Sequence, residues 1–220
     1  MSDPNNKIYA LNLSGGGARG AYQAGVLSAM SEYVQNDFPF QVITGVSAGA
    51  INASPLAASN RTFKEETRLL VDSWQKLTIE SIFKTNIGCL SWSLARWMWM
   101  LASGHSNKAV KALFNTTPLN HYLQKSFNPE GIEANIRIGR LRALGITTTC
   151  YTSGETITFV QGNSDVSSWK RRRRLSLLGK ISVEHIMASA ALPIFFPAIE
   201  ISGGYYGDGS IRQYSPLSPA

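Results

Sequence analysis

The chain has 220 residues, of which 44% are hydrophobic and 16% charged, so it is long enough to bury a continuous core and has too much apolar content for a disordered protein. The net charge is +7, but one run, Lys170 to Arg174, supplies five of the positive charges and leaves an excess of only two elsewhere. Such a local charge argues against a nucleic-acid-binding domain with a broad basic face.

The N-terminal sequence MSDPNNKIYALNL has no basic segment followed by a long apolar one, so no signal peptide is predicted. Nor does any stretch contain the ~18 consecutive apolar residues of a membrane span. The two cysteines, Cys89 and Cys150, form no metal-ligand or redox motif, which favours a reducing compartment over a disulfide scaffold. We therefore expect a cytoplasmic or peripheral membrane protein.

The first part of the chain predicts two strand–turn–helix units. Residues 7–13 fit a short buried strand, and residues 21–34 fit a helix with small and apolar residues at helical spacing. Residues 40–46 and 47–58 repeat the pattern. Two such units in succession indicate a parallel sheet with helices packed on it, so the predicted fold class is α/β, with a central, mostly parallel sheet flanked by helices.

The rest of the chain predicts further helices and strands. Residues 61–125 are helical in pattern but less regular, and residues 142–162 fit two strands joined by a turn at Ser153 and Gly154. The remaining predicted segments are a surface connection over residues 163–180, a helix over 182–192 that stops at Pro193, and short strands within 195–210.

Ser47 is a candidate nucleophile. It lies in Gly45-Val46-Ser47-Ala48-Gly49, between a predicted strand and a predicted helix. The spacing G-x-S-x-G at such a junction is typical of a nucleophile elbow, where a strained turn exposes the hydroxyl and the two glycines let strand and helix approach. The pentapeptide also arises by chance, so its position carries the prediction. A serine nucleophile needs a base, and none of the three histidines lies beyond His185.

A second glycine-framed segment, Gly15-Gly16-Gly17-Ala18-Arg19-Gly20, connects the first predicted strand to its helix. Backbone N–H groups of such a loop converge at the positive end of the helix and can bind an oxyanion. The same residues satisfy G-x-G-x-x-G of dinucleotide sites. Those sites need an acidic residue after the second strand, where this chain has Ser47, and the nearest acid, Asp37, precedes that strand. An oxyanion site is therefore favoured, and no cofactor is predicted.

Asp208 is the candidate base. It lies between Gly207 and Gly209 after a short predicted strand, so its carboxylate can project from a tight turn. An aspartate within hydrogen-bond reach of a serine can accept its proton when it is partly desolvated. An Asp-Gly pair is also common in ordinary turns, where the aspartate caps its own backbone. Paired with Ser47, it would form a dyad without an imidazole.

The three segments in this order, GGGARG, GVSAG and Asp208-Gly209 after ASAALPIFFPAIEI, resemble the patatin-like phospholipases over residues 8–219. The resemblance implies one domain over residues 1–220, with a fold related to but distinct from the α/β-hydrolase fold. It also implies hydrolysis of lipid acyl esters, with Ser47 as nucleophile, Asp208 as base and the amides around Gly16 and Gly17 as the oxyanion hole. Arg19 matches a basic position beside that loop in the family.

The chain departs from the family pattern in two places. Ser210 follows Gly209, whereas the family usually has Gly or Ala there, so the local turn can differ. Family members also generally continue beyond segments like the one that ends at Ala220, so either a domain trimmed at its C-terminal end or a natural short form is expected. This second departure favours the alternative of a non-catalytic lipid-binding or membrane-associated protein with the same fold.

Other polar and aromatic groups allow more than one interpretation. His185 lies beside an apolar helix face, which predicts a packed, hydrogen-bonded histidine. His105 and His121 have no partner pattern, so no metal site is predicted. The basic run fits either a solvated loop or a contact with anionic lipid headgroups. An aromatic stretch fits either a core helix or an interfacial helix or lid near an acyl pocket. The residues of these two segments are Lys170, Arg171, Arg172, Arg173 and Arg174, and Trp92, Trp97, Trp99 and Met100.

Overall fold

The computed structural model describes residues 8–34, 38–78, 116–193 and 195–213. Cys89, His105 and the aromatic stretch with Trp92, Trp97, Trp99 and Met100 lie outside these residues. In chain order the elements are β1 (Ala10–Leu13), α1 (Arg19–Ser31), β2 (Val42–Val46), α2 (Ala48–Ala58), α3 (Phe63–Lys76), α6 (Thr117–Ser126), α7 (Pro129–Arg137), β3 (Ala143–Cys150), β4 (Thr156–Gly162), β5 (Lys170–Arg171), β6 (Arg174–Leu178), α8 (Val183–Ala190), β7 (Ile199–Ile201), β8 (Gly204–Asp208) and a 3₁₀ turn, Gly209–Ile211.

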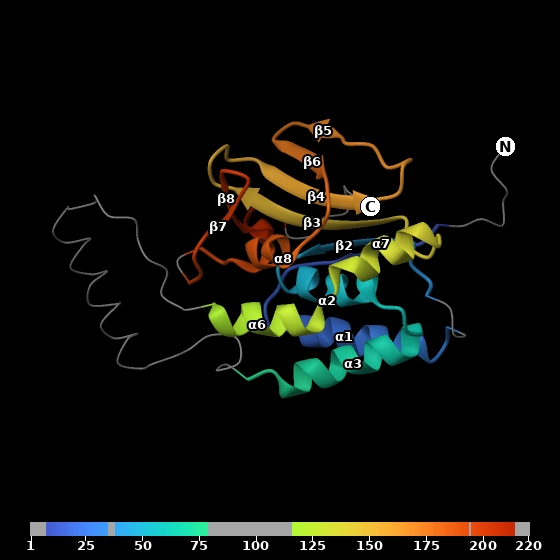
Figure 1. The fold of residues 1–220 in the computed structure, drawn as a ribbon. Helices are drawn as coiled ribbons and strands as arrows, with labels where there is room; N and C mark the ends of the chain where they lie inside the picture. Colours follow the sequence, from blue (N-terminus) through green and yellow to red (C-terminus); the bar gives the residue numbers. More distant parts are fainter. Residues whose placement is uncertain (1–7, 35–37, 79–115, 194, 214–220) are drawn as a thin grey trace.

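The strands form one sheet in the order β1-β2-β3-β4-β6-β5, with β8 pairing to β3 and β7 pairing to β8 (Figure 1). The predicted α/β class, a central sheet flanked by helices, is confirmed. The sheet is mixed, however, so the expectation of a mostly parallel sheet is wrong. Strands β1, β2 and β3 are parallel neighbours, as are β4 and β6, whereas β3–β4, β3–β8, β5–β6 and β7–β8 are antiparallel.

Short turns explain three of the four antiparallel pairs, because a tight turn can join only antiparallel neighbours; the fourth, β3–β8, pairs strands far apart in the chain. The predicted turn at Ser153 and Gly154 joins β3 to β4. There Gly154 adopts φ +68° and its N–H donates to the carbonyl oxygen of Cys150 at 2.9 Å. A second turn, at Ser202 and Gly203, joins β7 to β8 with both residues at positive φ. The parallel part is confined to strands joined by helical crossovers and to the β4–β6 pair.

Helix α2 lies directly on the sheet. It packs on β1, β2 and β3, with α8 beside it on β3 and β8, while α1 and α3 pack on each other farther from the sheet (Figure 1). Nearly all of α2 is buried, including Ala50, Ala53 and Ala57, because its small side chains let it approach the strands closely. This close packing fixes the start of α2 against the end of β2, where Ser47 lies.

Two elements differ from the sequence-based expectation. Residues 163–180 were expected to form a surface connection, but β6 lies within them and pairs with β4, which buries Ser176. Helix α7 was not predicted, although Asn128 caps it by accepting from the N–H of Glu130 and Pro129 occupies its first turn. Within the described segments, no helix has the length and apolar content that crossing a membrane requires.

Candidate active site

Ser47 occupies a sharp turn between β2 and α2. Its backbone has φ 56° and ψ −126°, a conformation that costs a non-glycine residue about 1–3 kcal/mol. The flanking glycines permit it. A Cβ on Gly45 would lie 2.6 Å from the carbonyl oxygen of Gly49, and a Cβ on Gly49 would collide with the carbonyl oxygen of Leu13. The G-x-S-x-G spacing therefore reflects a close approach of strand and helix at this junction.

The register of β3 brings Asp208 beside Ser47. Strand β2 pairs with β3 as far as Val46 and Thr147, and the next residue of β3, Thr148, pairs with Asp208 of β8. Asp208 therefore lies beside β3 at the position that the next residue of β2 would occupy if the chain did not turn at Ser47. The Ser47 Oγ donates a hydrogen bond to Asp208 Oδ2 at 2.6 Å, and both residues are buried, with Asp208 fully so.

Ser189 of α8 supports the backbone of Ser47. Its hydroxyl accepts the N–H of Ser47 at 2.9 Å and donates to the carbonyl oxygen of Thr147 at 2.7 Å. Ser189 is completely buried, and its neighbours Ala188 and Ala190 are apolar. Sequence reasoning did not identify it, although a lone serine within an apolar helix is a signal that a buried polar partner is needed.

The second oxygen of Asp208 binds the residue that departs from the family pattern. Asp208 Oδ1 accepts from the N–H of Ser210 at 2.7 Å and from its hydroxyl at 2.6 Å. Gly209 between them is required sterically, because a Cβ there would collide with the carbonyl oxygen of Thr147. Tyr151 lies nearby, and burial together with the negative charge of Asp208 raises the pKa of its phenol.

The glycine loop lies against this pair. A Cβ on the buried Gly15 would be 2.8 Å from the Cβ of Ser210 and 3.3 Å from the Cβ of Ser47. Gly16 and Gly17 have φ of +151° and +54°, which turn the chain into α1. Within the described part of the chain, the N–H groups of Gly16, Gly17 and Ala18 donate no hydrogen bond. The loop therefore offers donors at the positive end of α1, and α2 begins directly after Ser47.

The last two residues of the predicted loop belong to α1. Arg19 is its first residue, exposed, with its side chain against Gly16. Gly20 is buried under the indole of Trp74, where a Cβ would overlap the ring.

A buried polar network holds the loop from the side of the helices. Gln23 of α1 donates to the carbonyl oxygen of Ser14 at 2.9 Å, and Asn52 of α2 donates to the carbonyl oxygen of Gly20 at 3.0 Å and to Gln23 Oε1 at 3.1 Å. The Trp74 Nε1–H donates to Asn52 Oδ1 at 2.7 Å. Sequence reasoning missed these residues, because their partners are on three different helices.

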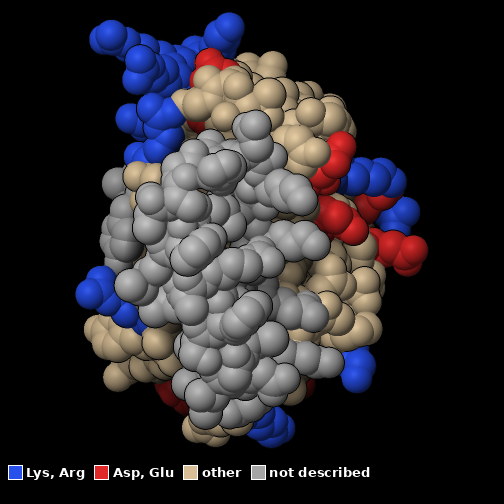
Figure 2. Space-filling view, turned by 90° about the vertical axis from the view of Figure 1, so that its left-hand side faces the viewer, with Lys and Arg blue, Asp and Glu red and all other residues tan. Residues whose placement is uncertain are grey.

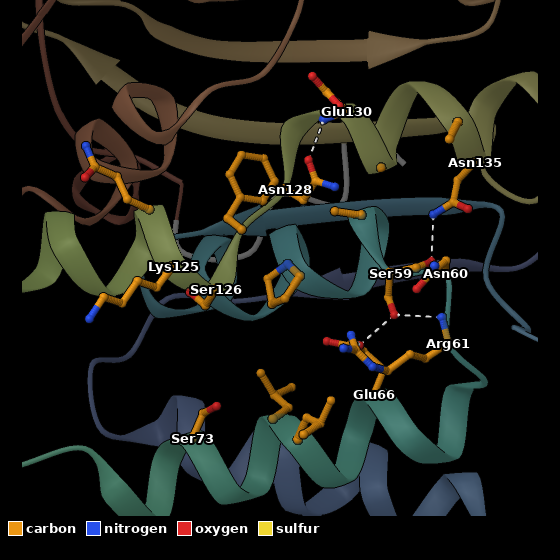
Figure 3. Close-up of a pocket in the computed structure, with 18 of the residues that line it drawn as sticks. Ser59, Asn60, Arg61, Glu66, Ser73, Lys125, Ser126, Asn128, Glu130 and Asn135 are labelled. Carbon is orange, nitrogen blue, oxygen red and sulfur yellow. Dashed lines mark hydrogen bonds and ion pairs between the residues drawn. The ribbon is translucent and has the colours of Figure 1, made fainter.

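A cavity of about 880 Å³ lies elsewhere, at the end of α2 opposite Ser47, between α3, α6 and α7 (Figure 3). The buried Glu66 accepts from the hydroxyl of Ser59 at 2.6 Å and pairs with Arg61 at 3.4 Å, while Asn135 donates to the carbonyl oxygens of Ala57 and Ser59. These polar walls bind one another, and none of the candidate residues lines the cavity.

The histidine interpretation holds for His185. Its Nδ1 accepts from the N–H of Ser182 at 3.1 Å, and its ring packs edge-on against Phe159 with centroids 4.4 Å apart. Burial lowers the pKa of His185. Among the described residues, no group of three His, Cys, Asp or Glu side chains is arranged to hold a metal ion.

The basic run forms the β5–β6 hairpin rather than a plain loop, and all five of its side chains are exposed. The Arg171 guanidinium lies 5.5 Å from the ring centroid of Trp169. In the sheet, Arg174 pairs with Thr156, and Thr156 pairs with Thr149. Thr149 follows Thr148, which pairs with Asp208. The hairpin turn is therefore at the same end of the sheet as the Ser47–Asp208 pair. Figure 2 views this end, with Lys and Arg side chains gathered at its top.

Fold and site together define an α/β protein with a serine–aspartate pair beside a glycine-rich loop. The sequence matches the patatin-like phospholipase family over residues 11–220, so the chain belongs to that family. Among solved structures it is similar to VipD from Legionella pneumophila, with 18% identity and a TM-score of 0.49 over 93% of this chain. The match covers 46% of VipD, so the chain spans less than half of that protein. No curated protein matches it.

Proposed function

We propose that this protein hydrolyses fatty acyl esters of phospholipids and lysophospholipids through an acyl-serine intermediate. Membership of the patatin-like phospholipase family supports action on lipid esters in general. The observation that carries the specific mechanism is the 2.6 Å hydrogen bond from Ser47 Oγ to the buried carboxylate of Asp208. A serine hydroxyl in direct contact with a potential base is the arrangement that nucleophilic catalysis requires.

In the proposed reaction, Ser47 Oγ attacks the ester carbonyl carbon while its proton passes to Asp208 Oδ2. The tetrahedral oxyanion is held by N–H groups of the loop at Gly16 and Gly17, which have no acceptor among the described residues, and by the positive ends of α1 and α2. Asp208 then gives this proton to the departing alcohol. The acyl group stays on Ser47 Oγ as an acyl-enzyme. In the second half of the reaction, Asp208 takes a proton from a water molecule, whose oxygen attacks the acyl carbon. The fatty acid is released, and the proton passes from Asp208 to Ser47 Oγ.

The dyad is tested by the rates at which wild type, Ser47→Ala and Asp208→Asn hydrolyse a short-chain nitrophenyl ester and a phospholipid. Ser167→Ala, at an exposed serine far along the chain from the site, is the matched control. We expect losses of at least about a thousand-fold in the two site variants, since dyad members act as a unit, and none in the control. A labelled fluorophosphonate should add its mass to Ser47 in wild type.

Equal rates in all four proteins would refute the dyad. Lipid binding by wild type that survives Ser47→Ala, with no turnover and no labelled serine, would instead identify a non-catalytic lipid-binding protein.

The β5–β6 hairpin is proposed to contact anionic membrane surfaces near the site. Three strand spacings of about 4.8 Å separate β6 from β8, so Arg174 lies roughly 14 Å across the sheet from Asp208. A surface attracted to the hairpin would therefore face the end of the sheet where Ser47 lies. Each basic residue near an anionic surface contributes about 1 kcal/mol to binding.

This contact is tested with vesicles of neutral phospholipid, with and without an acidic phospholipid. The double variant Arg172→Gln/Arg174→Gln should bind the acidic vesicles about thirty-fold more weakly than wild type. The control Lys125→Gln/Arg137→Gln removes the same charge from α6 and α7 and should bind as wild type does. Binding that is equally strong without acidic lipid would refute the contact.

A further inference from the structure

The carboxylate of Asp208 lies between two serine hydroxyls. Its Oδ2 accepts from Ser47 Oγ at 2.6 Å, and its Oδ1 accepts from Ser210 at 2.6 Å from the hydroxyl and 2.7 Å from the N–H. We infer that Ser210 is a positioning residue, whose hydroxyl holds the carboxylate with Oδ2 turned toward Ser47. The inference rests on the proposed function, in which Asp208 is the base.

The hydroxyl of Ser210 adds to what the backbone alone supplies. Asp208 caps the 3₁₀ turn Gly209–Ile211, and any residue except proline at position 210 could donate its N–H to Oδ1. Glycine or alanine there, the usual family residues, would give that bond and no more. The terminal torsion of an aspartate is broad, so one hydrogen bond leaves the carboxylate plane loosely defined. A second charge-assisted bond to the same oxygen restricts the rotation.

Ser210 also links the carboxylate to the glycine loop. A Cβ on Gly15 would lie 2.8 Å from the Cβ of Ser210 and 3.3 Å from the Cβ of Ser47, so both side chains pack against the Cα of Gly15. Because Gly15 and Asp208 are both buried, the contact leaves little room for movement. Nucleophile, base and loop are thus held in one packed unit by a residue outside the three motifs.

The role has a consequence that simple packing would not have. Without the hydroxyl, only the N–H of residue 210 holds Oδ1 of Asp208. The carboxylate would then sample orientations in which Oδ2 faces away from Ser47, which lowers kcat while KM stays unchanged.

The test compares wild type with Ser210→Ala and Ser210→Gly, which keep the N–H and remove the hydroxyl, and with the exposed-serine control Ser167→Ala. The first measurement needs no turnover: ¹³C NMR relaxation of labelled aspartate carboxyl groups reports how freely the Asp208 carboxylate moves. We expect this motion to increase in both Ser210 variants. The second is steady-state kinetics, in which kcat should fall about ten-fold while KM stays unchanged.

Two results would overturn the inference. One is unchanged motion of the Asp208 carboxylate by NMR together with unchanged kcat in Ser210→Ala and Ser210→Gly. The other is a fluorophosphonate adduct on Ser210 in Ser47→Ala, which would make Ser210 a nucleophile served by the same carboxylate. If wild type neither hydrolyses esters nor reacts with the label, the proposed function fails, and the NMR relaxation still decides whether Ser210 restricts the carboxylate.

Discussion

Replacing Ser189 by alanine should destabilise the protein through the turn at Ser47. The substitution removes the acceptor of the Ser47 N–H and the donor to the carbonyl oxygen of Thr147, both of which are buried. A buried polar group left without a partner costs about 1–3 kcal/mol. With two such groups, the free energy of unfolding should fall by about 2–4 kcal/mol.

Ser54 offers a matched control. It is also completely buried, in α2, and its hydroxyl donates to the carbonyl oxygen of Ala50 at 2.7 Å. That carbonyl keeps its helical hydrogen bond in Ser54→Ala, so this variant should lose less than about 1 kcal/mol.

Urea unfolding followed by circular dichroism measures both free energies. Ser189→Ala should also lower Tm by about 4–16 °C, given roughly 2–4 °C per kcal/mol for a chain of this length. Equal losses in Ser189→Ala and Ser54→Ala would refute the reasoning, because the two differ only in the groups left unpaired.

Two further predictions concern residues around the site. The lowered pKa of His185 means that the unfolded chain binds a proton below its ordinary value of 6.5 while the folded protein does not, so stability should fall as pH drops from 6.5 toward the folded pKa. His185→Gln should flatten the dependence of the unfolding free energy between pH 7.5 and 5.5, and an unchanged slope would contradict this. Trp74→Phe leaves Asn52 Oδ1 without its donor and should cost about 1–3 kcal/mol in urea unfolding; an unchanged free energy of unfolding would contradict the role of the network.

The sequence determined the features that depend on local backbone geometry. The glycines at positions 45 and 49 mark a close approach of β2 and α2, and the consecutive glycines before α1 mark a turn with positive φ. Strand and helix periods around them were sufficient to predict β1, α1, β2 and α2. The turn at Ser153 and Gly154 was likewise legible, because glycine there adopts a conformation that other residues rarely do.

Tertiary structure decided what depends on pairing between distant segments. Nothing local predicts that Thr147 pairs with β2 and Thr148 with β8, yet this change of partner along β3 puts Asp208 within 2.6 Å of Ser47. The supporting hydroxyls of Ser189 and Ser210 come from residues whose own surroundings show no motif. The sequence by itself determined where the chain can turn and which side chains could react; only the packed fold decided which of them meet, because the register of a sheet and the partners of buried hydroxyls are set by contacts between segments far apart in the chain.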